Sequence, residues 1–144
     1  MRARPLLHDF AKVTTEGKAE LVKTTQDLAG AIDSSGICMF TNVMFPPEHL
    51  AQMLDAACAG EWDLERLNTI GERVWNLERQ FNLAAGFTGA DDCLPERMRT
   101  EPAVGGAADG QVAELSQMLG EYYSLRGWDQ EGVPRDDTLA RLEL

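Results

Sequence analysis

An apolar stripe with a helical period runs through the middle of this 144-residue chain and constrains its fold more than any other feature. The stripe recurs at spacings of 3, 3, 4, 3 and 4 residues, at Leu64, Leu67, Ile70, Val74, Leu77 and Phe81. Such spacing places all six side chains on one face of an α-helix. The pattern therefore predicts a helix that begins after an N-cap at Asp63 and runs to about Ala85.

One glycine lies inside this helical pattern. Gly71 costs about 1 kcal/mol relative to alanine at such a position. Its missing side chain predicts either a close helix crossing or a close approach to a ligand. Four charged residues of the same segment are expected to form surface salt bridges worth about 0–1 kcal/mol each: Glu72, Arg73, Glu78 and Arg79.

A second helical signal precedes the stripe. It spans 16–33, with Thr14 or Thr15 as the expected N-cap. The helix is predicted to end at Gly36, because glycine readily takes the left-handed conformation that closes many helices.

Three more helices are predicted along the chain. One begins at Pro46-Pro47, where the fixed φ of proline suits a first turn. Its apolar stripe contains Cys58, which is therefore expected to be a buried and inert thiol. The others span 111–126 and 135–142. Because few segments alternate β-branched residues, the predicted fold is all-α: an irregular domain of about four to five helices with a long Gly/Pro-rich loop.

The long loop is predicted from Phe87 to Gly110, with a short helical turn at 94–98. A loop of more than 20 residues is unusual inside a compact domain unless it is functional or packs on a partner. Residues 1–14 show no clear period and are expected to be a connector. The remainder, 15–144, is expected to be a single helical domain.

Composition excludes several classes of function. The net charge of −11 argues against nucleic-acid binding, which needs clustered Lys and Arg. No apolar run approaches the ~20 residues that span a bilayer, and the N-terminus lacks the apolar core of a signal peptide. The three cysteines, Cys38, Cys58 and Cys93, are widely spaced and do not suggest a disulfide framework, so a reducing cytoplasm is the expected location.

The end of the first predicted helix carries the chemistry. Asp33 and Cys38 flank its break and lie five residues apart, which exposes a carboxylate and a soft sulfur donor on one turn. Thiolates suit iron–sulfur clusters and zinc. A four-iron cluster normally needs four thiolates, however, and the three cysteines of this chain share no short spacing. Read from spacing alone, Cys38 is better explained as a small buried hydrophobe.

The wider pattern changes this interpretation. The sequence Asp33-x-x-Gly36-Ile37-Cys38 resembles the Asp-x-x-Gly-Leu-Cys motif of the tungsten-dependent aldehyde:ferredoxin oxidoreductase family, with Ile37 where leucine is usual. Three later segments resemble further landmarks of that family, in the same order: residues 71–82, 91–97 and 121–128. The likeness covers roughly residues 15 to 144 and corresponds only to the C-terminal portion of the family.

The resemblance implies two cofactors. Cys38 would be the fourth ligand of a [4Fe–4S] cluster, whose other three cysteines belong to a body absent from this chain. Asp33 would accept hydrogen bonds from a pterin of the tungsten bis-pterin cofactor, and the Gly36-Ile37 backbone would run close to that pterin. Asp27 could be a neighbour of the pterin, but a solvated or salt-bridged carboxylate is the better reading.

The implied reaction is oxidation of an aldehyde to a carboxylic acid, with electrons passed to ferredoxin. Catalytic acids and histidines of the family have no counterpart here, since His8 and His49 lie outside matching positions, so no catalytic residue is assigned. The implied partners are the missing N-terminal body and ferredoxin, without which the chain would be inactive.

Two other readings remain open. The domain could be a cofactor-free helical scaffold or interaction module derived from the family. It could also be a thiol-based redox protein that uses Cys38 with Cys58 or Cys93, although no C-x-x-C is present and no neighbour clearly lowers a thiol pKa. The surface around Asp33 and Cys38 separates the first of these from the oxidoreductase reading, because an open apolar face there indicates a missing partner.

Overall fold

The computed structural model describes residues 15–40 and 45–144. The predicted connector at 1–14 and residues 41–44 therefore lie outside the described residues. Within them the chain forms α-helices and two short 3-10 turns, with no β-strand, which confirms the all-α prediction. The α-helices are α1 (Lys18–Ser35), α3 (Pro47–Ala57), α4 (Leu64–Ala84), α5 (Glu96–Thr100), α6 (Leu115–Arg126) and α7 (Asp136–Leu142).

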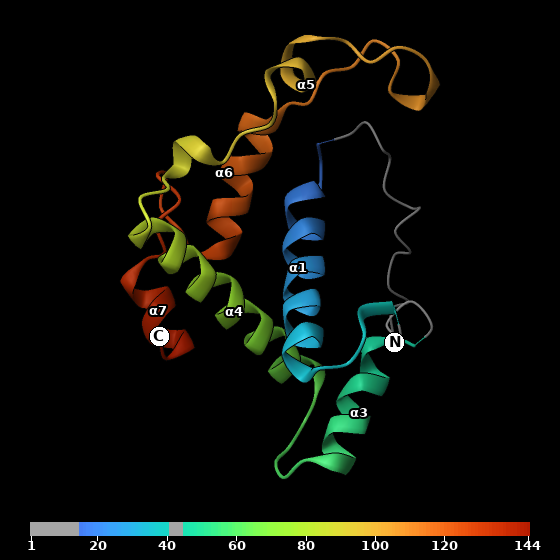
Figure 1. The fold of residues 1–144 in the computed structure, drawn as a ribbon, viewed down its shortest axis with the longest axis vertical. Helices are drawn as coiled ribbons and strands as arrows, with labels where there is room; N and C mark the ends of the chain where they lie inside the picture. The colour runs from blue at the N-terminus through green and yellow to red at the C-terminus, as the bar shows by residue number, and fades with distance from the viewer. Residues whose placement is uncertain (1–14, 41–44) are drawn as a thin grey trace.

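Helices α1 and α4 form the centre of the fold, and α4 runs diagonally past α1 (Figure 1). Their backbones touch at Gly71, where a Cβ atom would lie only 1.7 Å from the carbonyl oxygen of Asp27. Next to this point the indole Nε1 of Trp75 donates a hydrogen bond to the carbonyl oxygen of Gln26 at 2.8 Å. The glycine predicted to allow a close crossing or a ligand approach thus serves the crossing.

The main apolar core lies at the C-terminal half of α1, where α3 and the start of α4 meet it. Its buried members are small or aliphatic: Ala31, Ile32, Leu50, Ala51 and Leu67. Partly buried side chains close the core, among them Ile37 from the loop after α1. The same core therefore supports both the end of α1 and the loop that follows it.

A second packed region joins α4 to the C-terminal helices. Trp128 and Tyr123 are buried there, and the indole Nε1 of Trp128 donates to Asn76 Oδ1 at 2.8 Å. Gly127 closes α6 in the left-handed conformation at φ 70°, and its carbonyl oxygen accepts a hydrogen bond from the Thr138 hydroxyl at 2.9 Å. These contacts fold α7 back against α4.

Two ion pairs made by buried arginines connect distant segments of the chain. Arg126 of α6 pairs with Asp27 of α1, and both side chains are almost fully buried. Arg79 of α4 donates two hydrogen bonds to Asp92 at 2.7 and 3.0 Å and a third to the carbonyl oxygen of Gly132. The prediction that Arg79 forms a surface pair is wrong, because its side chain is buried against Trp128.

Two other charged residues of α4 form ion pairs as predicted. Glu72 accepts two hydrogen bonds from Arg141 of α7 and also lies 3.8 Å from Lys23 of α1. Arg73 pairs with Glu143 at 2.6 Å. No ion pair of Glu78 is found among residues 15–40 and 45–144.

Three predicted helix ends can be compared with the structure. Asp63 caps α4, since its carboxylate accepts a hydrogen bond from the Arg66 backbone N–H at 2.8 Å. The expected threonine cap of α1 is wrong, because Gly17, in the left-handed conformation, precedes that helix. The helix predicted over 111–126 is α6, which begins at Leu115 and not at residue 111.

The late start of α6 has a backbone cause. The carbonyl oxygen of Gln111 accepts a hydrogen bond from Ala103, and the N–H of Ala113 donates to Met98, both at 2.9 Å. These groups are therefore used by the preceding loop and are not available to a helix. The loop itself contains the predicted turn, as α5, and extends beyond the other helices at the top of the view (Figure 1).

Candidate functional site

The predicted site is a short loop built on the end of α1. Gly36 takes the left-handed conformation at φ 74°, and its N–H donates to the carbonyl oxygen of Asp33 at 3.2 Å. This confirms Gly36 as the residue that ends the helix, and it turns the chain sharply toward Ile37 and Cys38. Any residue with a side chain would be strained at this φ.

Two serine hydroxyls hold the turn. Ser34 Oγ donates to the carbonyl oxygen of Gly30 at 2.7 Å, and Ser35 Oγ donates to that of Ile32 at 2.6 Å. Ser35 Oγ also accepts a hydrogen bond from the Ile37 N–H at 3.3 Å. The last turn of α1 and the loop after it are therefore linked by side chains as well as by backbone.

Side chains of the loop point in opposite directions. Ile37 is half-buried and packs against the core of α1, α3 and α4. Asp33, Gly36 and Cys38 are exposed, and no heavy atom lies within 4 Å of a Cβ position on Gly36. The loop thus presents a carboxylate, an open stretch of backbone and a sulfur atom on an anchored support. This arrangement fits residues that hold a cofactor.

The surface next to the loop is apolar and open. Met39 is 47% exposed and Phe40 is 81% exposed. Single exposed apolar side chains are common on protein surfaces, whereas contiguous ones mark interaction sites, and Met39 and Phe40 are consecutive in the chain. Within the described part of the chain, about half of Met39 and most of Phe40 are left uncovered.

Similarity to known proteins agrees with this geometry. A sequence model of the family described as "Aldehyde ferredoxin oxidoreductase, domains 2 & 3" matches residues 3–144. This chain belongs to the aldehyde ferredoxin oxidoreductase family. Its resemblance to the C-terminal part of that family is thereby confirmed.

Curated relatives carry the same family name. The chain is 40% identical to the tungsten-containing aldehyde ferredoxin oxidoreductase of Thermococcus kodakarensis over 90% of its own length and 21% of that protein. It is 39% identical to the protein of the same name from Pyrococcus abyssi, over 95% of this chain and 22% of the relative. The chain therefore spans about a fifth of the length of the relatives it matches.

A solved structure shares the fold. It is the active site complex BamBC of benzoyl coenzyme A reductase in complex with 1,5-dienoyl-CoA, with a TM-score of 0.71 and 21% sequence identity. The alignment covers 91% of this chain and 20% of the other. At this identity the match supports the helical fold.

Asp27, the other carboxylate considered near the family motif, is not part of an open site. It is buried and pairs with both Lys23 and Arg126. The salt-bridged reading is therefore confirmed. Its partner Arg126, 99 residues later, has no sequence signal that singles it out from the other arginines.

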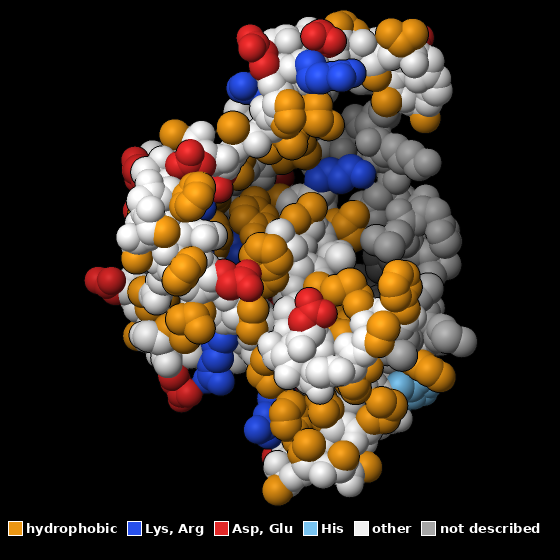
Figure 2. Space-filling model, viewed as in Figure 1, with side chains coloured by type: hydrophobic (Ala, Val, Ile, Leu, Met, Phe, Trp, Pro, Cys, Tyr) orange, Lys and Arg blue, Asp and Glu red, His pale blue; other side chains and the backbone are white. Residues whose placement is uncertain are grey.

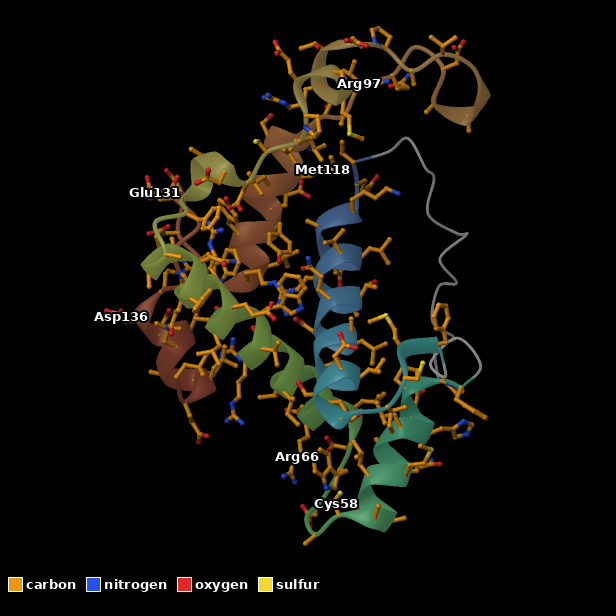
Figure 3. The ribbon with its side chains drawn as sticks, viewed as in Figure 1. Cys58, Arg66, Arg97, Met118, Glu131 and Asp136 are labelled. Atoms are coloured by element: carbon orange, nitrogen blue, oxygen red, sulfur yellow. The ribbon has the colours of Figure 1, made fainter. Side chains whose placement is uncertain are left out.

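The remaining cysteines occupy other surfaces. Cys58 follows α3 and is exposed at the edge of the molecule (Figure 3), so the prediction of a buried thiol is wrong. The side chains of α3 that pack on the core are Leu50, Ala51 and Leu54, and Cys58 lies beyond them. Cys93 is exposed in the loop before α5. Among the residues that the structure describes, no three His, Cys, Asp or Glu side chains gather into a metal site.

A cavity of about 480 Å³ lies between α1, α4, α6 and the loop at 91–94. Sequence analysis did not predict it, because the pattern over 111–126 indicated a helix but not which other elements that helix would face. Polar tips of the aromatic lining residues are already hydrogen-bonded inside the protein: Trp75 to Gln26, Tyr122 to Gln26, Tyr123 to Asp92 and Trp128 to Asn76. The cavity walls thus offer mainly apolar surface. The α1 residues that line the cavity belong to the first half of that helix, away from the family motif at its end.

No helix in the described ranges is long and apolar enough to cross a membrane.

Proposed function

We propose that this chain is the C-terminal segment of a tungsten-containing aldehyde oxidoreductase and contributes to two cofactor sites. In this proposal the Cys38 thiolate binds one iron of a [4Fe–4S] cluster. The Asp33 carboxylate accepts hydrogen bonds from a pterin. The complete enzyme would oxidise an aldehyde to a carboxylic acid and pass the electrons to ferredoxin.

The observation that carries the proposal is the division of the loop into an anchored and an exposed side. Ile37 is held in the core, while Asp33 and Cys38 are exposed on either side of Gly36. A buried motif would have favoured a structural role for the cysteine. The open apolar surface at Met39 and Phe40 supports a missing protein partner in the same place.

Each exposed group has chemistry that suits its proposed ligand. A thiolate is a soft donor for iron, and a carboxylate is acceptor-only, which matches the N–H donors of a pterin edge. Gly36 has open space where a side chain would be, so a ring could approach its backbone. When bound, the tungsten pterin would supply the oxygen and hydride chemistry. The chain's own groups would bind and orient the cofactors.

Assembly with a larger polypeptide is part of the proposal. Three further cluster ligands must come from outside the described residues, which hold only three cysteines on separate elements. The body that makes up the rest of the family's length is the proposed source. Because thiolate ligands need a reducing compartment, the proposed location is the cytoplasm.

The test is metal analysis under anaerobic conditions. The chain is purified alone and after co-expression with the polypeptide that carries the family's N-terminal body, and iron, tungsten and visible absorption are measured. Iron and tungsten are expected only in the co-purified complex. Cys38→Ser should lower the iron content and the visible absorption, whereas Cys58→Ser, an equally exposed cysteine outside the motif, should leave both unchanged.

Two outcomes would contradict the proposal. A co-purified complex that keeps its full iron content and spectrum in Cys38→Ser would exclude this thiolate as a ligand. A metal-free, stable chain that does not bind the body would favour the cofactor-free scaffold.

A further inference from the structure

The apolar stripe of α4 is only half covered. Leu67 near its start is 1% exposed, but Leu77 is 57% exposed and Phe81 is 73% exposed. Phe87, just after the helix, is 55% exposed. We call Leu77, Phe81 and Phe87 the outer ridge. Hydrophobic side chains are visible over α4 on this side of the molecule (Figure 2).

The change from buried to exposed follows from the helix crossing. Helix α4 packs on α1 around Gly71 and then diverges from it, so the stripe beyond that point has no helix over it among the described residues. On another side of the same turns, Asn76 and Arg79 bind Trp128 and Gly132. The C-terminal helices are therefore held against that side and leave the outer ridge open.

The exposed half keeps the spacing of the buried half. Leu77 and Phe81 lie four residues apart and are neighbours on the helix surface. A stripe that continues with the same period is the pattern by which a helix packs into an apolar groove of another protein. The outer ridge thus has the form of a packing surface without its partner.

Charge argues against a second copy of this chain as that partner. The chain carries a net charge of −11, so two copies would repel each other. Glu78 follows Leu77 in sequence but lines the cavity between α1, α4 and α6, so its charge is not part of the ridge. A partner with an apolar socket would complement this surface.

The length of the relatives indicates where such a partner would come from. The chain spans 21–22% of the two relatives described above, so most of a family protein lies outside it. We infer that the outer ridge of α4 is a second docking surface, separate from the cofactor loop, which packs into an apolar socket on the body of the oxidoreductase. This inference rests on the proposed function, because it takes the body as the partner.

The test measures binding of variants to the co-expressed body. Leu77→Ser and Phe81→Ser should each weaken binding by about tenfold or more, as expected for central apolar contacts. Val104→Ser is the control: it removes an apolar side chain that is 98% exposed in a separate loop, and binding should not change.

Folding is checked in the same variants. Leu77 and Phe81 are largely exposed in this chain, so their replacement by serine should lower the thermal midpoint of the isolated domain only slightly, through the lower helix propensity of serine. Unchanged binding in both serine variants would overturn the inference. So would an equal loss in Val104→Ser, since the effect would then not be specific to the ridge.

Two further outcomes separate this inference from the proposal it depends on. If Cys38→Ser loses iron but still binds the body, while Phe81→Ser does not bind, both stand. If the wild-type complex contains iron that is lost in Cys38→Ser, and both ridge variants bind the body as well as the wild type does, the proposed function stands. Only the inference about the outer ridge is then overturned. The isolated chain could instead form a concentration-dependent dimer that is absent in Phe81→Ser. That result would overturn the inference, because the ridge would then be a surface of self-association.

Discussion

The backbones of Gly71 and Asp27 meet so closely that a single methyl group between them could not be accommodated. A Cβ atom on Gly71 would lie 1.7 Å from the Asp27 carbonyl oxygen and 2.6 Å from its Cα. Gly30 faces the same crossing, but a Cβ there would remain 3.5 Å from the Gly71 Cα and from Val74, an ordinary contact distance. The contact between α1 and α4 thus depends on one of these two glycines.

Gly71→Ala should destabilise the domain by about 3 kcal/mol or more, because the two backbones would have to separate. Gly30→Ala is the matched control. It should be neutral or stabilising by up to about 1 kcal/mol, since alanine has the higher helix propensity and the space exists. Urea unfolding followed by circular dichroism measures both, and equal midpoints for the two variants would show that the crossing can relax.

Removing the Asp27 carboxylate should be among the most destabilising single changes to a charged group. Arg126 is 0% exposed and would be left without its counter-ion, a loss that costs about 3–5 kcal/mol in buried pairs. Asp27→Ala is compared with Glu143→Ala, which breaks the more exposed pair with Arg73 and should cost about 0–1 kcal/mol. Similar free energies of unfolding for the two variants would contradict a buried, desolvated pair.

Stability should depend on acid pH through Glu72. Partial burial alone raises the pKa of Glu72, but the hydrogen bond from Arg141 and the charges of Lys23, Arg141 and Arg126 outweigh it and hold the pKa below its usual value. Such a carboxyl binds fewer protons in the folded state. It therefore stabilises the fold above its unfolded pKa of about 4.3, and this contribution is lost as pH falls through the folded pKa.

The difference in free energy of unfolding between wild type and Glu72→Gln measures this contribution. It should be about 1–3 kcal/mol and nearly constant at neutral pH, and it should shrink as the pH falls below about 4. A difference that stays the same in acid would mean that the ion pairs of Glu72 with Arg141 and Lys23 do not contribute.

The two tyrosines of the chain should titrate late. Burial, together with the hydrogen bond to Asp92 and the charge of Asp92, raises the pKa of Tyr123 to about 12. Burial also raises the pKa of Tyr122, although Arg126 acts in the opposite direction. Since these are the only tyrosines, ultraviolet titration of the folded chain should show little tyrosinate at pH of about 10, where an exposed tyrosine is half ionised.

The same titration has a consequence for stability. A tyrosine with a raised pKa contributes stability that is present below its unfolded pKa of about 10 and is lost as pH rises toward the folded value. In Tyr123→Phe the ionisation step at a pH of about 12 should disappear. A titration of two normal tyrosines in the folded protein would show that neither phenol is buried as described.

Much of the architecture could be predicted from local sequence signals. The helical period over 64–81, the cap at Asp63 and the glycine that ends α1 are short-range effects, and the structure confirms each of them. The family motif was also readable, because its residues are close together in sequence. Burial was predicted less well: Cys58 lies on an apolar stripe and is exposed, whereas Arg79 is charged and buried.

These errors have a common cause. A stripe shows which side of a helix can pack, but not how far along its length another element covers it. The crossing of α1 and α4, together with the position of α3, determines that Leu67 is buried and Phe81 is exposed. Likewise, Asp27 and Arg126 are 99 residues apart, and no local pattern could pair them.

The sequence by itself therefore determined the helical class, the helix that carries the motif and the family to which the chain belongs, because each depends on residues within a few turns of one another. Tertiary structure alone decided which face of the motif loop is open, which charges are buried and where the stripe of α4 is left uncovered. These properties depend on contacts between distant segments, whose geometry is set by how closely the backbones can approach at Gly71.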